Sequence, residues 1–192
     1  MSKIYTAIVG GKDKERTDIQ VFKDFDKFKL PVFNAKIYKV LPHLFLDLKE
    51  NEWSVWVDGN ITLKVDPEEL IKMVKTDIGV FPHPDRTCLF DEAAYCMHYG
   101  IGNQKEIADQ IKQYSKFPKG KGLAMCGILV RKNTLEMRSL CEKWWAEICR
   151  GSNRDQISFP YVFNGKVSYF PYQKNIKDNP YFKRYGHEKT FQ

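Results

Sequence analysis

The sequence predicts an α/β protein with a mainly parallel central sheet flanked by helices. Two observations favour this fold class. Short apolar segments of β-forming residues alternate along the chain with helix-like segments, which is the order that places parallel strands beneath crossover helices. The 192 residues also include 43% hydrophobic residues, enough for one buried core. Because no change of composition and no internal repeat divides the chain, we expect a single domain over residues 1–192.

The N-terminal half is predicted to contain four strands and two helices. A glycine pair should end the first strand, and Pro42 should kink or divide the first helix. Three signals agree on the start of the second helix: Asp66 can cap it, Pro67 suits its first position, and Glu69 completes a capping box. The predicted strands cover residues 3–9, 19–22, 53–58 and 78–82, and the predicted helices cover residues 35–48 and 66–75.

The C-terminal half is predicted to contain four helices and two strands. Its clearest helix covers residues 134–150, with Asn133 and Glu136 as a capping box and Gly151 as the stop. Two other helices are predicted over residues 91–99 and 104–114, and a shorter one is predicted to begin at residue 154. The predicted strands cover residues 123–131 and 167–170. The tail from residue 175 is expected to be irregular. Five side chains at helical spacing on the long helix should face the core. They are Met137, Leu140, Cys141, Trp144 and Ile148.

Charge, cysteine content and hydropathy exclude several classes of protein. The net charge is +7, but the lysines are scattered, so a nucleic-acid partner has only charge in its favour and is not expected. The five cysteines form no Cys-x-x-Cys pair, which favours reduced core thiols over disulfides or a zinc site. No apolar run approaches the ~20 residues of a membrane span, and the N-terminus lacks a signal peptide's cationic flank. We therefore expect a cytoplasmic protein.

Polar residues after the predicted strands are the first candidates for a ligand site. Ligands of open α/β sheets bind beyond the carboxyl ends of the strands. After the first strand, Gly10 permits close backbone approach, and Lys12 and Arg16 can meet phosphate. An ordinary surface turn is the alternative, since neither a dinucleotide fingerprint nor a P-loop is present.

The third predicted strand ends in a second candidate. Asp58 can bind a hard divalent cation through oxygen, Gly59 gives access, and Asn60 supplies a neutral oxygen. The alternative is a tight Asp-Gly hairpin into residues 61–64, because Asp-Gly is a strong turn signal.

His83 and Arg86 follow the fourth predicted strand. A guanidinium at this place can bind phosphate or a sugar carboxylate in a forked geometry. A structural salt bridge with Asp85, Asp91 or Glu92 is the alternative.

Asp155 opens the helix that is predicted to begin at residue 154. Its carboxylate can act as an N-terminal cap of that helix. It can equally be the carboxylate of a site that faces a reacting sugar.

An ordered set of segments that covers most of the chain carries a family resemblance. The segments are residues 35–43, residues 55–63 followed by Asp66-Pro67, residues 83–88 with Glu92-Ala93, residues 122–131, and residues 144–147 followed by 154–161. In this order they resemble the glycosyltransferase-like domain of the TOD/MUCI type, which occurs in plants, bacteria and large algal viruses. The plant relatives carry membrane anchors that this chain lacks, which is typical of a bacterial or viral form.

The resemblance implies a GT-A (Rossmann-like) fold and a nucleotide-diphosphate sugar donor, expected to be a UDP-sugar. It also implies Mn²⁺ or Mg²⁺ as cofactor. The segment from Asp58 to Asn60 stands where other GT-A enzymes carry Asp-x-Asp, so Asn60 replaces the second acid. His187 matches a late histidine that serves as a further metal ligand in some of those families. Asp155 and Gln156 look like the Asp-Gln element near the donor sugar.

The implied chemistry transfers a hexose or pentose to a glycan or glycoprotein acceptor. A cation held by Asp58 would neutralise the leaving diphosphate, and Arg86 could share that task. If the reaction inverts the anomeric configuration, a carboxylate must take the acceptor proton, with Asp155 as the first candidate and Glu147 as the second. If it retains the configuration, Asp155 would stabilise the oxocarbenium-like centre.

Two other classes stay open as alternatives. A non-catalytic protein that binds nucleotide or sugar agrees with the missing second acid at Asn60. A hydrolase has less support, because the sequence contains neither Gly-x-Ser-x-Gly nor His-Glu-x-x-His.

Overall fold

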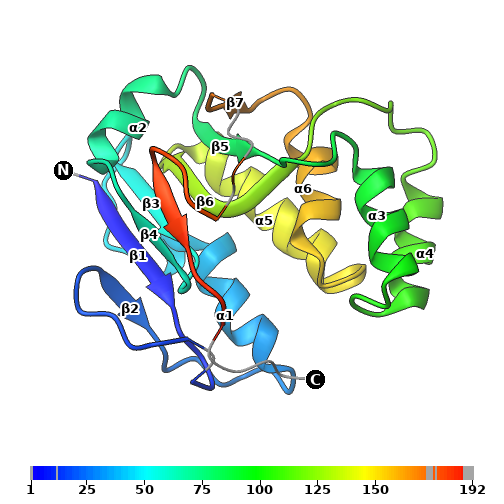
Figure 1. The fold of residues 1–192 in the computed structure, drawn as a ribbon, viewed down its shortest axis with the longest axis horizontal. Coiled ribbons are helices and arrows are strands. Elements are labelled where there is room, and N and C mark those ends of the chain that lie inside the picture. The colour runs from blue at the N-terminus through cyan, green and yellow to red at the C-terminus, as the bar shows by residue number, and fades with distance from the viewer. Residues whose placement is uncertain (1, 12, 172–174, 176, 188–192) are drawn as a thin grey trace.

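A six-stranded sheet forms the centre of the molecule (Figure 1). The structure is a computed structural model that describes residues 2–11, 13–171, 175 and 177–187. The strands lie in the order β2-β1-β3-β6-β5-β7, and within the described chain β6 runs against the other five. The predicted mainly parallel α/β class is therefore confirmed. The strands are β1 Lys3–Ala7, β2 Gln20–Phe22, β3 Trp53–Val57, β5 Ile78–Pro82, β6 Ala124–Lys132 and β7 Ser168–Tyr169.

The two central strands, β3 and β6, are apolar on both faces. Val55 pairs with Val130 and faces one core cluster, whereas Trp56 pairs with Leu129 and faces the other. Since side chains alternate across a strand, a strand covered on both sides needs a continuous apolar run. This explains why residues 53–57 and 124–130 are recognisable from the sequence.

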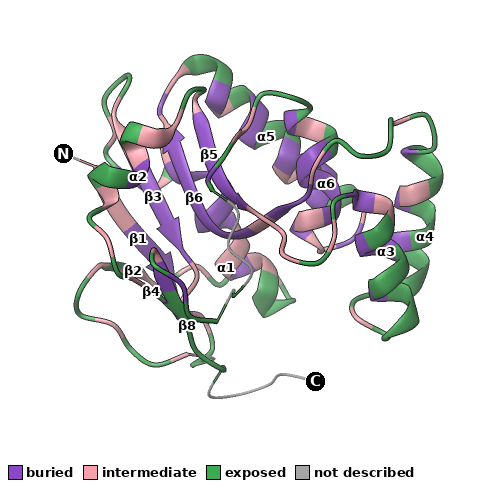
Figure 2. Ribbon diagram, turned by 45° about the horizontal axis from the view of Figure 1, so that its top comes forward, coloured by how far each residue is buried: buried purple, intermediate pink, exposed green. Residues whose placement is uncertain are grey.

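Three helices cover one face of the sheet, and a helix and a small sheet cover the other. α1 (Pro31–Val40), α5 (Leu135–Arg150) and α6 (Asp155–Phe163) contribute to the first core cluster. α2 (Pro67–Met73) packs on the opposite face through Leu70. Figure 2 shows the buried residues concentrated on the sheet and on the sides of α5 and α6 that pack against neighbouring elements.

α3 (Leu89–His98) and α4 (Gln104–Gln113) form a lobe at one end of the molecule (Figure 1). They share a third apolar cluster with Ile157 of α6, which joins the lobe to the main body. Figure 2 shows that the outer side of this lobe is largely exposed.

The first helix differs from the prediction. It was expected over residues 35–48, but α1 begins at Pro31 and ends at Val40, and a 3₁₀ turn over Pro42–Leu44 follows. Pro31 has the fixed φ and missing N–H that suit the first helical turn. Pro42 lacks the N–H that would continue the helix, so the chain turns there.

The caps of two helices are only partly as predicted. Asp66 caps α2 by accepting a hydrogen bond from the Glu68 N–H. At α5, however, the cap is Thr134, whose hydroxyl accepts from the Met137 N–H. Asn133 instead donates to the carbonyls of residues 48 and 49, so the predicted capping box at Asn133 is wrong. The five predicted core-facing residues of this helix are all buried.

A second, two-stranded sheet was not predicted. β4 (Ile61–Leu63) pairs with β8 (Phe182–Arg184) in antiparallel orientation. The Asp58 carbonyl accepts from the Ile61 N–H, so the chain does turn after β3. Yet β4 pairs with β8 and not with β3, which excludes the hairpin alternative. Residues 182–184 are also ordered as a strand, unlike the irregular tail expected there.

The cysteines agree with a reduced core. Four of the five are buried, and Cys149 is exposed. Within the described residues, no helix combines the length and the hydrophobicity that crossing a bilayer would require.

Candidate active site

A cavity of about 610 Å³ opens at the carboxyl ends of β1, β3 and β5. Residues 7–9, 56, 58–59 and 83–86 line it from these three strand ends. α1 contributes Lys36 and Lys39 to its wall, and the start of α6 contributes residues 153–156. The place agrees with the rule for open α/β sheets, so the cavity is the candidate active site.

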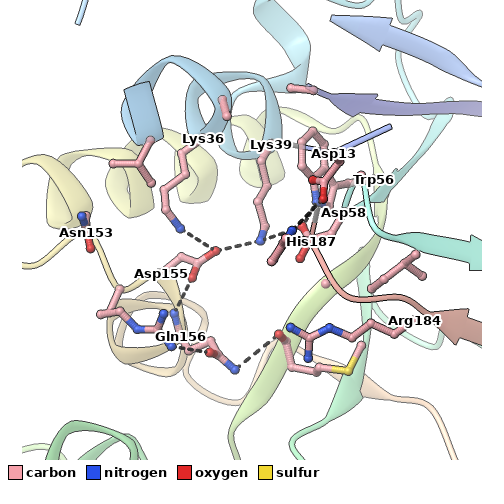
Figure 3. A pocket seen from close by; sticks show the side chains of 18 of the residues that line it. Asp13, Lys36, Lys39, Trp56, Asp58, Asn153, Asp155, Gln156, Arg184 and His187 are labelled. Atoms are coloured by element: carbon pink, nitrogen blue, oxygen red, sulfur yellow. Dashed lines mark hydrogen bonds and ion pairs between the residues drawn. The ribbon is translucent and has the colours of Figure 1, made fainter. Parts of the chain in front are cut away.

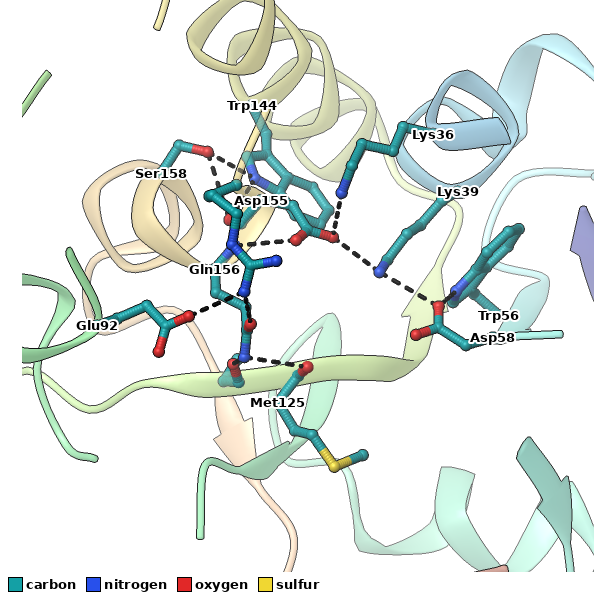
Figure 4. Close-up of polar contacts among 12 residues, drawn as sticks. Lys36, Lys39, Trp56, Asp58, Glu92, Met125, Trp144, Asp155, Gln156 and Ser158 are labelled. Carbon is teal, nitrogen blue, oxygen red and sulfur yellow. Dashed lines mark hydrogen bonds and ion pairs between the residues drawn. The ribbon is translucent and has the colours of Figure 1, made fainter. Parts of the chain in front are cut away.

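A chain of alternating charges crosses the cavity (Figures 3 and 4). Lys39 Nζ lies 2.8 Å from Asp155 Oδ2 and 3.3 Å from Asp58 Oδ1. Lys36 Nζ approaches the same Asp155 oxygen at 3.1 Å. One buried ammonium therefore joins the carboxylate that ends β3 to the carboxylate that begins α6.

These contacts fix the charge states of the groups. Burial alone would raise the pKa of the Asp155 carboxyl, but Lys36 and Lys39 hold that pKa well below its usual range. Burial would lower the pKa of Lys39, but the neighbouring Asp155 and Asp58 raise it above its ordinary value. Burial does lower the pKa of Lys36, although Asp155 opposes the shift. The Asp155–Lys39 pair is therefore ionised at neutral pH.

The position of α1 explains how two lysines reach one carboxylate. Lys36 and Lys39 are three residues apart and therefore lie on one side of the helix. Neighbouring Ile37 and Val40 belong to the core cluster beneath it. Arg131 of β6 donates to the carbonyls of Lys39 (2.6 Å) and Val40 (3.4 Å), so it holds the last turn of α1 against the sheet.

The lysine pair was not among the predicted site residues. Its signal in the sequence is two cations on the core-facing part of an otherwise apolar helix, where an unpaired charge would be costly. Asp13, Arg154 and Arg184 also line the cavity without having been assigned to the site.

Asp58 presents one of its oxygens to the cavity. Its Oδ1 accepts from the Trp56 indole N–H at 2.7 Å and faces Lys39. Among the described residues no partner contacts Oδ2, and the side chain is 37% exposed. Gly59 leaves room here for Asp13, because a Cβ at this position would lie 2.8 Å from Asp13 Oδ2 and would displace that side chain. The chain therefore holds Asp58 rigidly while it leaves one oxygen for a ligand.

Asn60 does not reach the cavity. Asn60 is buried, and its side-chain amide donates to the Tyr185 carbonyl at 2.8 Å. The Tyr185 N–H in turn donates to the backbone carbonyl of Asn60. The expected metal ligand thus anchors the segment after β8. His187, at the end of that segment, does line the cavity, where its Nδ1 lies 2.6 Å from Asp13 Oδ1.

The protein alone does not present a complete cation site. Among the described residues, no three His, Cys, Asp or Glu side chains converge as a ligand set. Mg²⁺ is often bound by only one or two carboxylates together with phosphate oxygens. The free oxygen of Asp58 fits that arrangement, so this residue can hold a cation that arrives with a diphosphate.

A second polar network joins the far side of the cavity to α3. Glu92, which is buried, accepts from Arg86 at 2.7 Å and from Arg154 at 3.0 Å. Both hydrogen bonds lower the pKa of the Glu92 carboxyl against the effect of burial. The predicted salt-bridge alternative for Arg86 is thus realised with Glu92, although Arg86 and His83 also line the cavity.

Gln156 and His83 are fixed within this wall. The Gln156 amide donates to the carbonyls of Ala124 (3.1 Å) and Met125 (3.3 Å) of β6. Burial and the charge of Arg86 lower the pKa of the His83 imidazole. His83 is therefore neutral at pH 7.

Three other predicted residues, all within the described part of the chain, are not brought to the cavity. Glu147 accepts a 2.5 Å hydrogen bond from Tyr114 on the far side of α5, which removes it as a candidate base. Arg16 pairs with Asp18 at 2.6 Å and donates to a backbone carbonyl, so its charge is already engaged. Gly10 adopts a positive φ of 71° in the turn after β1. Lys12 lies outside the described residues.

Comparison with known proteins gives a family and similar solved structures. The model of a family described as TOD1/MUCI70, glycosyltransferase-like domain, matches residues 19–179. No curated protein matches the chain at a significant level. Among solved structures, the chain is similar to the apo structure of the bifunctional glycosyltransferase WbbM, with 12% identity and a TM-score of 0.49. That likeness covers 79% of this chain and 26% of the WbbM chain.

Proposed function

This chain belongs to the TOD1/MUCI70 family of glycosyltransferase-like domains, and from that premise we propose that it transfers a sugar from a nucleotide-diphosphate donor to a glycan or glycoprotein acceptor. A UDP-sugar with a hexose or pentose is the donor we expect. The observation that carries the proposal is the Asp58–Lys39–Asp155 chain of charges in the cavity at the strand ends.

The two carboxylates at the ends of this chain of charges suit the diphosphate and the sugar of a donor. Asp58 lies at the end of β3, where a diphosphate can share a divalent cation with its free oxygen. Asp155 lies at the start of α6 beside Gln156, and the side-chain oxygens of both can accept hydrogen bonds from sugar hydroxyls. Lys39 bridges the two positions and can stabilise negative charge that develops on the leaving phosphate.

Mn²⁺ or Mg²⁺ remains part of the proposal, with Asp58 as its protein ligand. When bound, such an ion would supply Lewis-acid stabilisation of the leaving diphosphate. Asn60 is left out of this ligand set because its amide holds the Tyr185 carbonyl. His187 could join through Nε2 while its Nδ1 keeps the contact with Asp13.

Asp155 suits the role of electrostatic stabiliser better than that of base. A general base works best when its pKa lies near the working pH. The pKa of Asp155 is instead held far below that range by two lysines. A permanently ionised carboxylate can stabilise positive charge that develops at the anomeric carbon, and its contacts position Lys36 and Lys39.

The test is nucleotide binding followed by turnover. Thermal-shift measurements with UDP, GDP and their sugars, each with and without Mn²⁺, should show stabilisation by at least one nucleotide. Asp58→Asn should remove the part of this thermal stabilisation that depends on Mn²⁺. Asp155→Asn should still bind nucleotide but lose transfer by a factor of about 10² or more, measured as released nucleoside diphosphate.

Asp26→Asn is the matched control, because Asp26 is an exposed carboxylate that pairs with neighbouring Lys27. It should leave binding and turnover unchanged. Stabilisation by none of the nucleotides would refute the proposal. Nucleotide binding with neither transfer nor donor hydrolysis would instead identify a non-catalytic binder.

A further inference from the structure

An exposed pair of aromatic rings lies at the C-terminal end of α3, next to the cavity, with Tyr95 in the helix and Tyr99 as its C-cap. Tyr95 and Tyr99 are four residues apart and therefore lie on the same side of the helix. Their ring centroids are 4.5 Å apart, and the two residues are 39% and 61% exposed. His98 meets the Tyr99 ring edge-on at 4.6 Å. Together the two tyrosines form a small aromatic platform.

The platform does not serve the packing of the lobe. The side of α3 that faces α4 and α6 carries Leu89, Ala93 and Cys96, and these form the buried cluster. Neither tyrosine belongs to that cluster or to the partly buried residues around it. A helix needs only one apolar face to pack, so the rings on this other face call for another explanation.

The platform is joined rigidly to the cavity. Tyr95 itself lines the cavity, and the Arg86 guanidinium lies 4.0 Å from the centre of its ring. Arg86 is fixed by Glu92, which also holds Arg154 beside Asp155. A continuous set of contacts thus leads from the carboxylate at the centre of the cavity to the exposed rings.

From this continuity we infer that Tyr95 and Tyr99 form the acceptor subsite and stack against a sugar ring of a carbohydrate acceptor. The inference rests on the proposed function. The apolar face of a pyranose ring suits an aromatic platform, because tyrosine combines a flat apolar body with a polar tip. The phenol hydroxyls, and the His98 imidazole that meets the Tyr99 ring, can form hydrogen bonds with the hydroxyl groups of the sugar.

The test uses saccharides as probes, independently of any donor. Saturation-transfer NMR with methyl glucoside, methyl galactoside, methyl mannoside, cellobiose, lactose and maltose should detect at least one bound sugar. In Tyr99→Ala that sugar should bind about tenfold more weakly. Tyr99→Phe, which keeps the ring, should bind within about twofold of the original protein. UDP affinity should stay unchanged in both variants.

Leu135→Ala is the control for loss of an exposed apolar side chain, since Leu135 is 73% exposed at the start of α5. It should bind the saccharide normally. Absence of binding to every saccharide, or equal affinity in Tyr99→Ala, would overturn the inference. A failure of UDP to bind would instead count against the donor site, and the saccharide result would still decide the acceptor subsite.

Discussion

Lys39 is the residue on which the geometry of the cavity depends. Its side chain is almost fully buried and lies between two carboxylates of different elements. A buried ammonium is stable only when its charge is compensated, and Asp155 provides most of that compensation. Lys36 compensates the same carboxylate from the adjacent turn of α1.

We predict that Lys39→Met destabilises the protein by about 3 kcal/mol at pH 7, because it removes the ammonium that lies 2.8 Å from the buried Asp155 carboxylate. Urea unfolding followed by circular dichroism would measure this. Lys72→Met, at an exposed position of α2, should change the free energy of unfolding by no more than ~0.5 kcal/mol. Equal stabilities of the two variants would contradict the buried ion pair.

The stability that the Asp155 carboxylate contributes should also depend on pH. The pKa of Asp155 is lower in the folded protein than the value of about 3.9 in an unfolded chain. Its stabilising contribution is therefore complete above about pH 4 and is lost as the pH falls toward the folded pKa. The difference in stability between the original protein and Asp155→Asn should accordingly shrink as the pH falls from 5 to 3. A difference that stayed constant over this range would refute the assignment to Asp155.

At the scale of elements, α1 is held in place by a buried arginine of β6. Arg131 donates to two carbonyls of the last helical turn and to the Tyr5 hydroxyl at 2.5 Å. Carbonyls of the last turn of a helix have no partner within it, so a cation at that end is favourable. Arg131 therefore connects β1, β6 and the helix that carries Lys39.

We predict that Arg131→Met destabilises the protein by about 3 kcal/mol, because the Tyr5 hydroxyl and the helix carbonyls would be buried without partners. Nucleotide affinity should fall as well, since the last turn of α1 would no longer hold Lys39 in position. Urea unfolding and UDP titration would measure the two effects. Arg150→Met, which removes an exposed arginine of α5, should produce neither. Undiminished UDP affinity in Arg131→Met would show that Lys39 is placed without Arg131.

Elements with a strong local pattern were predictable, and their exact ends were not. The apolar runs of β3, β5 and β6 and the periodic face of α5 were found at nearly their full length. The start of α1 at Pro31 was missed although proline suits the first helical position, and the cap at Thr134 was missed because Asn133 is an equally good cap in isolation. Tertiary hydrogen bonds of Asn133 to residues 48 and 49 decided that choice.

At the scale of the whole molecule, β8 returns from the C-terminal part of the chain to one side of the cavity (Figures 1 and 3). Phe182 anchors it in the core, with its ring centroid 5.0 Å from that of Phe81. The segment that follows brings Arg184 and His187 to the cavity.

We predict that Phe182→Ala lowers nucleotide affinity although Phe182 is not part of the cavity, because the anchored segment would lose its position. The variant should also lose about 3–5 kcal/mol of stability. Phe163→Ala, in the core on the other face of the sheet, should cost a similar amount but leave the UDP affinity of the folded protein unchanged. UDP titration under conditions where both variants are folded would compare them. Equal affinities would show that β8 does not shape the donor site.

The sequence by itself determined the order of the main elements, the mainly parallel sheet and the strand ends from which the cavity is built. It also pointed to Asp58 and Asp155. These features depend on apolar periodicity and turn residues, which act over short distances along the chain. Only the tertiary structure decided that Asp155 pairs with Lys36 and Lys39, that Asn60 anchors Tyr185 and that Glu147 points elsewhere. Such pairings join residues far apart in the chain, and the packing of helices on the sheet sets which charges can meet.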